Sequence, residues 1–171
     1  MTTPLTFKII GTASGQPRHI SRAWIDKVTG KPRAGVRPDD SADDWKNCIR
    51  LAVRGRVPAV PIAGPVICHL TFLFHRPQYM HAAKYLPGLI PYTAKPDRDN
   101  LDKAVLDTLT ELKFWRDDAQ VFMGRLGKWY CAKDPAAADG IGRPGCMVTI
   151  EPVGDEHVYT AEYLAKRKVV A

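Results

Sequence analysis

The chain has 171 residues, of which 45% are hydrophobic and 25% are charged, and its formal net charge at pH 7 is +7. This length supports one domain with a core of its own, and no apolar stretch approaches the roughly 20 residues that a membrane-spanning helix needs. The first residues, MTTPLTFKII, lack the basic and apolar regions of a signal peptide, so the cytoplasm is the expected compartment.

Hydrophobic patterning predicts an α+β fold in which two main helices cover a mixed β-sheet within one domain, residues 1–171. Runs rich in β-branched and aromatic residues predict the strands, and apolar residues at helical spacing predict the helices. The predicted order is strand 5–10, strand 22–28, a helix capped at 39–41 that runs to about 55, strand 66–75, helix 101–112, and strands 121–131 and 146–151.

Proline and glycine mark the connecting segments. Residues 11–37 are otherwise rich in loops, with a turn at Thr29-Gly30, and residues 58–65 form a proline-rich connector. Residues 134–145 are expected to form a wide hairpin loop between the last two strands, and residues from about 155 a short helix or a flexible basic tail. The long segment 77–94 contains three tyrosines that either pack it against the domain or stack on unpaired bases, namely Tyr79, Tyr85 and Tyr92.

Cysteine and histidine spacing argues against a zinc site. The four cysteines form no C-x-x-C pair, and the five histidines match neither H-x3-H nor H-E-x-x-H. We therefore expect all four cysteines, Cys48, Cys68, Cys131 and Cys146, to be reduced thiols.

Charge is distributed unevenly along the chain. Residues 16–37 contain six Lys or Arg against one Asp, whereas residues 97–118 contain seven Asp or Glu against four Lys or Arg. A basic surface binds a polyanion by neutralising its phosphates, and clustered carboxylates bind divalent cations. The combination predicts a metal-dependent enzyme that acts on nucleic acid. The candidate DNA-binding residues are Arg18, Arg22, Lys27, Lys31, Arg33 and Arg37.

The acidic residues surround the best-patterned helix, in the stretch KPDRDNLDKAVLDTLTELKFWRDDAQ, residues 95–120. Asp97 and Asp99 stand just before that helix and Asp118 follows it, so a bend at each end can bring three carboxylates to one or two Mg²⁺ ions. Such ions activate water and stabilise the departing oxygen in phosphodiester hydrolysis. Lys103 lies four residues after Asp99, on the same helix face, and can stabilise the charge of the transition state.

The same residues also have a purely structural interpretation. Asp99 can cap the helix with help from Asp102, and Asp117 can start a turn. Lys103 can form an ion pair on the helix surface with Asp99 or Asp107. The residue pattern by itself leaves the metal site and the helix caps as alternatives.

The stretch resembles the signature of the RusA family of Holliday-junction resolvases, which reads D-x-D-N-L-x-K, then D-x-L, then W-x-D-D-x-Q. The resemblance is specific over about 26 residues, 95–120, and continues more weakly at Lys128 and in the basic loop 15–37. The matching residues are Asp97, Asp99, Asn100, Leu101, Lys103, Asp107, Leu109, Trp115, Asp117, Asp118 and Gln120.

The resemblance implies a homodimeric endonuclease, dependent on Mg²⁺ with Mn²⁺ as a substitute, that resolves four-way DNA junctions by paired symmetric nicks in DNA recombination and repair. It implies that Asp97, Asp99 and Asp118 bind the metal and that Lys103 is catalytic. It assigns no catalytic task to Asp107, for which support of the helix is the simpler interpretation. The chain is longer than the smallest family members at residues 77–92, at 132–144 and at the C-terminus.

Two other classes of function stay open. Pro96-Asp97 resembles the start of the restriction-type P-D…D/E-x-K motif, but Asp102 adjoins Lys103 directly and no D/E-x-K follows on a strand. That alternative is a nuclease of a different class, acting on other branched DNA. The second is a non-catalytic protein that binds branched DNA, in which the carboxylates only cap helices. Nicking that depends on a divalent metal distinguishes an enzyme from this second alternative.

Overall fold

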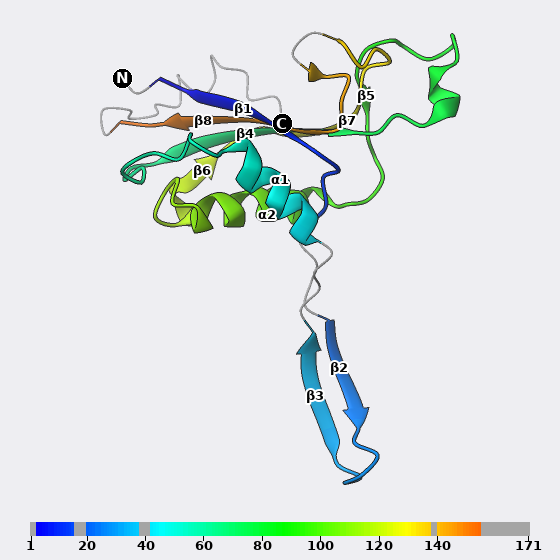
Figure 1. Ribbon diagram of the computed structural model, residues 1–171, viewed down its shortest axis with the longest axis vertical. Helices are drawn as coiled ribbons and strands as arrows, with labels where there is room; N and C mark the ends of the chain where they lie inside the picture. The colour runs from blue at the N-terminus through cyan, green and yellow to red at the C-terminus, as the bar shows by residue number, and fades with distance from the viewer. Residues whose placement is uncertain (1–2, 16–19, 38–41, 138–139, 155–171) are drawn as a thin grey trace, which may run out of the picture.

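The computed structural model describes residues 3–15, 20–37, 42–137 and 140–154. It confirms the predicted α+β fold, in which two helices lie against a six-stranded mixed sheet (Figure 1). The strands of this sheet are β1 (Leu5–Ile10), β4 (Val66–Phe74), β5 (Ile90–Pro91), β6 (Val121–Met123), β7 (Leu126–Tyr130) and β8 (Gly145–Pro152). The remaining elements are the helices α1 (Asp43–Ala52) and α2 (Arg98–Glu111), the short 3₁₀ helices η2 (Gln78–His81) and η3 (Asp118–Gln120), and a separate pair of strands, β2 (Ile20–Ile25) and β3 (Pro32–Arg37).

Strand β4 is the centre of the sheet. The order is β1-β8-β4-β7-β5, with β6 beside β4, and β4 is antiparallel to β8 but parallel to β6 and β7. Its sequence VICHLTFLF is buried except at His69 and Thr71, which are half-buried. A nearly continuous apolar run of this kind is typical of a strand that is covered on both faces.

The two helices cover one face of the sheet and form the main core with it. Trp45 and Ile49 of α1, Leu101 and Leu109 of α2, and Phe72 of β4 all belong to this single buried cluster. Burying each side chain of this size contributes about 1.5–3 kcal/mol. The packing of this cluster therefore fixes where both ends of α2 lie against the sheet.

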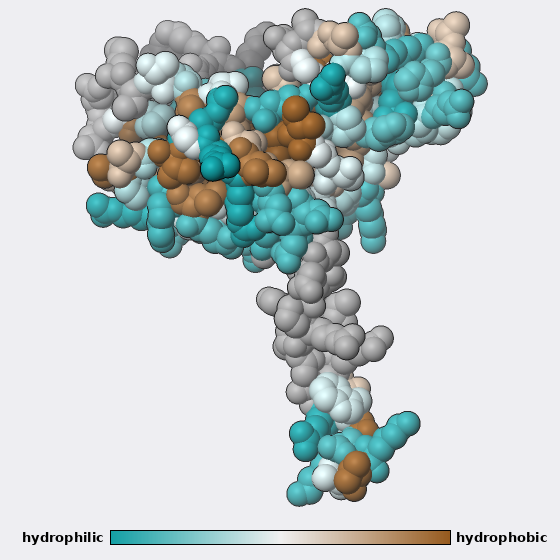
Figure 2. All heavy atoms as spheres, viewed as in Figure 1, coloured by the Kyte–Doolittle hydropathy of each residue, from teal (hydrophilic) through white to brown (hydrophobic). Residues whose placement is uncertain are grey.

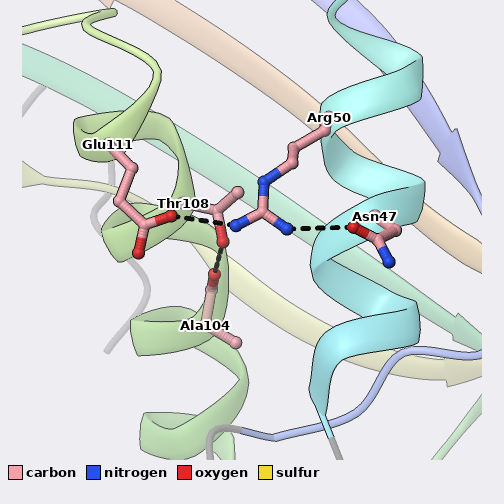
Figure 3. A network of polar contacts seen from close by, with 5 residues as sticks. All are labelled: Asn47, Arg50, Ala104, Thr108 and Glu111. Atoms are coloured by element: carbon pink, nitrogen blue, oxygen red, sulfur yellow. Dashed lines mark hydrogen bonds and ion pairs between the residues drawn. The ribbon is translucent and has the colours of Figure 1, made fainter. Parts of the chain in front are cut away.

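Polar contacts hold the helices to one another at their exposed edge (Figure 3). The Arg50 guanidinium on α1 donates to Glu111 on α2 at 3.1 Å and to Asn47 on its own helix at 3.0 Å. Thr108 is fully buried, and its hydroxyl donates to the carbonyl oxygen of Ala104 at 2.7 Å, so its polar atom is satisfied within α2. The two helices thus share an apolar contact with the sheet and a polar contact with each other.

Two predictions about the strands after α2 are wrong. Residues 121–131 form two strands, β6 and β7, because the backbone at Gly124 passes so close to β4 that an added Cβ would lie 1.9 Å from the carbonyl oxygen of Cys68. The register on β4 shifts in this region, and pairing resumes at Leu126. Residues 134–145 are not a hairpin loop, because β7 and β8 lie on opposite sides of β4.

The segment predicted to be loop-rich contains an unpredicted strand, β3, which pairs with β2 in a hairpin. The predicted strand 22–28 ends at Ile25, because the Asp26 carboxylate accepts hydrogen bonds from the backbone N–H groups of Val28 and Thr29 and turns the chain. Gly30 completes the turn at φ +66°. Figure 1 shows this hairpin extending away from the sheet and helices.

The predicted helices are present with shifted ends. Helix α2 begins at Arg98, three residues before the predicted start, and α1 begins after Ala42 as its N-cap. The predicted cap at 39–41 and the C-terminal tail lie outside the described residues. Within the described residues no helix has the length and apolar character to cross a bilayer.

The four cysteines are free thiols, as predicted. Cys68, Cys131 and Cys146 are buried, and burial raises the pKa of Cys68 to about 12. These side chains act as small apolar residues of the core rather than as ligands or nucleophiles.

Candidate active site

The candidate site lies at the N-terminal end of α2. Asp97 is the N-cap residue, in an extended conformation with φ −69° and ψ 153°, and its carbonyl oxygen accepts the hydrogen bond of Leu101 N–H at 3.2 Å. The interpretation of Asp99 as the helix cap is therefore wrong, since Asp99 lies within the first turn, and the side chain of the actual N-cap, Asp97, makes no capping hydrogen bond. Asp97 and Asp99 are both exposed, and together they present two carboxylates at one end of the helix.

The loop that leads into α2 is anchored to the sheet by Lys128 of β7. The Lys128 ammonium donates to the carbonyl oxygens of Ala94 and Pro96, each at 2.6 Å, and lies 5.1 Å from the centre of the Tyr92 ring. Two hydrogen bonds from one charged group restrain the backbone immediately before Asp97. The weak sequence match at Lys128 therefore marks a residue that positions the acidic end of α2.

Tyr92 anchors the same loop from the other side. Its ring stacks on Phe74 at 3.9 Å between centroids, and its hydroxyl donates to the carbonyl oxygen of Lys95 at 2.5 Å. The interpretation that Tyr92 packs its segment against the domain is thus confirmed. The pattern of the sequence could not identify this contact, because it depends on β4 and the loop meeting across the sheet edge.

The catalytic candidate Lys103 is exposed on α2 one turn after Asp99. A spacing of four residues places the two side chains on the same side of the helix. Gly15 packs against this end of α2, because an added Cβ would lie 3.0 Å from Cβ of Asn100 and 3.2 Å from Cβ of Pro96. The segment that leads into the basic hairpin therefore starts beside the acidic end of α2.

The W-x-D-D-x-Q segment after α2 is held by a network of structural contacts. The Asp117 carboxylate accepts from Ala119 N–H at 2.8 Å, and the Gln120 side-chain oxygen accepts from Asp117 N–H at 3.1 Å, which together form a capping box. The Gln120 amide also donates to the carbonyl oxygens of Ile62 at 3.0 Å and Gly64 at 2.8 Å. The turn predicted at Asp117 is confirmed, and the neighbouring Asp118 is exposed outside this network.

Asp118 lies at the opposite end of α2 from Asp97 and Asp99. A helix of 14 residues is about 21 Å long. The two ends of α2 also lie near opposite ends of β4. Lys128, which binds the loop before α2, is paired with Phe72 near the end of β4. Gln120, in η3 after α2, binds a carbonyl oxygen just before β4 begins. One chain thus presents two carboxylates at one end and one at the other. In the four described ranges, no three His, Cys, Asp or Glu side chains are grouped closely enough to hold a metal.

Asp102 lines a small cavity between α2 and the start of β7. The cavity has a volume of about 180 Å³, and its lining includes Arg98, Cys68 and Gly124. Burial raises the pKa of Asp102, and the nearby Arg98 guanidinium partly offsets this effect. Sequence patterning suggested only a helix-capping role for Asp102, because partial burial between two elements leaves no local signal.

The predicted DNA-binding residues fall mainly in the β2–β3 hairpin. Lys27, Lys31 and Arg33 are exposed there, and Arg33 forms an ion pair with Asp26 at 2.9 Å. Arg22 belongs to β2 and Arg37 to β3. The remaining candidate, Arg18, lies outside the described residues.

Comparison with known protein families places most of the chain. A family model described as Endodeoxyribonuclease RusA matches residues 14–138, which is more than two thirds of the chain. The matched range contains the hairpin, both helices and the whole acidic segment. No curated protein matches the chain.

Proposed function

Because the chain belongs to the RusA family of endodeoxyribonucleases, we propose that it is a metal-dependent nuclease that resolves four-way DNA junctions by paired symmetric nicks. The observation that carries this proposal is the exposed Asp97 carboxylate, which caps no helix although it occupies the N-cap position. A carboxylate held in place by its backbone and not used in the cap is suited to binding a ligand. Recombination and repair are the processes that such a reaction serves.

The carboxylates at the start of α2 fit a magnesium ion. Mg²⁺ prefers hard oxygen ligands and commonly takes only one or two carboxylates, with water and substrate phosphate completing its shell. Asp97 and Asp99 supply such a pair, and Mn²⁺ accepts the same ligands. When bound, the ion would lower the pKa of a water nucleophile and polarise the phosphodiester.

The chain's own residues contribute position and charge. Lys128 and Tyr92 fix the backbone before Asp97, so the two carboxylates stay in place when DNA binds. Lys103, one turn further along α2, places an ammonium group where it stabilises the charge that builds up on the phosphate. The exposed cations of the hairpin bind the flanking phosphates.

Asp118 enters the site, in our proposal, from a second copy of the chain. Within one chain α2 separates it from Asp97 and Asp99 by roughly the length of the helix. A twofold dimer that sets the start of α2 against η3 of its partner joins Asp97 and Asp99 to Asp118 of the partner subunit. The same symmetry creates two such sites, one for each nick.

The test is cleavage of a labelled four-way junction by the purified chain, with Mg²⁺ and with EDTA. We expect metal-dependent paired nicks, loss of cleavage in Asp97→Asn with junction binding retained, and a rate lowered about 30- to 1,000-fold in Lys103→Ala, equivalent to roughly 2–4 kcal/mol of lost transition-state stabilisation. Binding persists in these variants because the cationic hairpin is unchanged.

Asp44→Asn is a matched control, since Asp44 is an exposed aspartate in the first turn of the other helix. It removes the same charge from a helix N-terminus without touching the candidate site. Cleavage that survives in both Asp97→Asn and Asp99→Asn would refute the assigned site. Tight junction binding without any metal-dependent nicking would instead identify a non-catalytic binding protein.

A further inference from the structure

The β2–β3 hairpin places an aromatic side chain among cations. Its antiparallel register pairs Trp24 with Arg33. Paired residues of neighbouring strands share a face of the ribbon. Trp24 and Arg33 therefore lie on the same face, and the exposed Lys27 and Lys31 lie in the turn that joins the two strands.

The outer end of the hairpin combines fixed geometry with exposed apolar surface. Asp26 holds the turn through its hydrogen bonds to Val28 and Thr29, and it also binds Arg33. Trp24 is 50% exposed and Val28 is 93% exposed. Figure 2 shows hydrophobic residues at this far end among hydrophilic ones. Trp24, Ile25 and Val28 together leave apolar surface in water at a cationic tip, and grouped exposure of this kind is typical of a binding site.

We propose that Trp24 stacks on an unpaired or unstacked base of branched DNA and so provides preference for a junction over a continuous duplex. This inference rests on the proposed function and adds to it a residue that selects the substrate. Arg33 on the same face, with Lys27 and Lys31 of the turn, neutralises the flanking phosphates, and a two-stranded ribbon is narrow enough to enter a DNA groove.

Branched DNA suits this surface for two reasons. Its phosphates complement the cations around Trp24, and its branch point exposes base faces that a duplex keeps stacked. An aromatic side chain gains most from stacking when the base has no neighbour on that side. Gly15, five residues before β2, packs against Asn100 at the acidic end of α2, so the chain that leads toward the hairpin passes that end.

The experiment compares the binding of the full chain to a four-way junction and to linear duplexes made from the same sequences, with EDTA present. The variants are Trp24→Ala and Trp24→Phe, and Leu86→Ala serves as control because Leu86 is 71% exposed outside the hairpin. We expect Trp24→Ala to weaken junction binding roughly tenfold, in the range known for base stacking, with duplex binding changed less than about twofold. Trp24→Phe should retain most of the preference.

A second measurement uses a junction with 2-aminopurine at the branch point. Stacking on Trp24 should quench its fluorescence in the wild type and in Trp24→Phe, and the quench should be lost in Trp24→Ala. This inference alone is overturned if the wild type prefers junctions and Trp24→Ala shows the same preference and the same quench. A wild type without junction preference overturns the proposed function as well. If Trp24→Ala changes only the oligomeric mass in solution, Trp24 contacts a second copy of the chain, and the inference is also overturned.

Discussion

At the scale of single residues, the candidate site depends on which aspartates are used to hold the fold. Asp117 caps η3, and Asp26 organises the hairpin turn. Asp97 occupies an N-cap position without bonding the helix through its side chain. Carboxylates that look equivalent in the sequence are therefore separated by the structure into those that hold the backbone and those that remain available to a ligand.

Asp102 leads to a prediction about stability and pH. Burial raises its pKa in the folded chain, so the folded state binds the proton more tightly than the unfolded state does. Stability is then lost as pH rises above the ordinary aspartate pKa of about 3.9. We expect Asp102→Asn to unfold at higher urea concentration than the wild type at pH 7, and the difference to shrink as pH falls toward about 4.

The measurement is urea unfolding of both proteins from pH 4 to 8 with EDTA present, so that metal binding does not contribute. Asp44→Asn is again the control, because Asp44 is exposed and its replacement should not reproduce the trend. A stability difference that grows as the pH is lowered would contradict the burial argument.

At the scale of elements, the sequence predicted what its local pattern encodes. Alternating and helical apolar spacing identified β1, β4, β8 and α2 closely, because each contributes directly to the core. The pattern missed β3, because its sequence PRAGVR contains proline and glycine, which are depleted in strands, and it pairs with β2 outside the main sheet. It also placed β7 next to β8, since nothing local states that β4 lies between them.

The candidate site was likewise predictable only where a local sequence pattern encodes it. The residues at the start of α2 follow from the D-x-D-N-L-x-K spacing and the helix pattern. The separation of Asp118 from them could not be predicted from the sequence, because it depends on where η3 lies in the fold. Gln120 of η3 fixes that place by donating to the carbonyl oxygens of Ile62 and Gly64.

The hairpin as an element should carry much of the salt dependence of DNA binding. Replacing Arg22, Lys27 and Lys31 together with glutamine leaves the Asp26–Arg33 ion pair intact. Each lost phosphate contact lowers the slope of log K against log salt by about 0.9, so the triple variant should lose up to about 2.7 for duplex DNA. Fluorescence anisotropy titrations across a range of salt concentrations measure this slope.

The matched control replaces three exposed cations elsewhere in the molecule, Arg54, Arg56 and Lys84, with glutamine. It changes the net charge equally, so it should lower affinity slightly through the general field while retaining the slope. Equal losses of slope in the two triple variants would place the DNA-binding surface outside the hairpin.

At the scale of the whole molecule, the two ends of α2 make a dimer testable by complementation. In a shared site, Asp97→Asn chains and Asp118→Asn chains are each inactive alone, but a mixed dimer contains one intact site. We expect mixing and subunit exchange to restore single nicks in the junction, without paired resolution. If all ligands came from one chain, the mixed dimer would have none intact.

A mixture of Asp97→Asn with Asp99→Asn is the control, because both changes disable the same half of the shared site and no combination restores it. Denaturing gels of end-labelled junctions report nicks on each strand, and light scattering confirms that mixed dimers form. Absence of nicking in the Asp97→Asn and Asp118→Asn mixture, with mixed dimers present, would rule out the shared site.

The place of the hairpin in the fold has a consequence for how such proteins diversify. The chain packs against the core as far as Gly15 and rejoins it at Ala42, the N-cap of α1, and β1 and α1 pack against each other, with Gly11 against Cys48 on α1. The β2–β3 hairpin is therefore inserted between two neighbouring points of a core that packs without it. Loops in such positions change length at small thermodynamic cost. Hairpins of different length and composition can be exchanged there without disturbing the helix that carries the carboxylates. Substrate range can thus evolve separately from the residues proposed for catalysis.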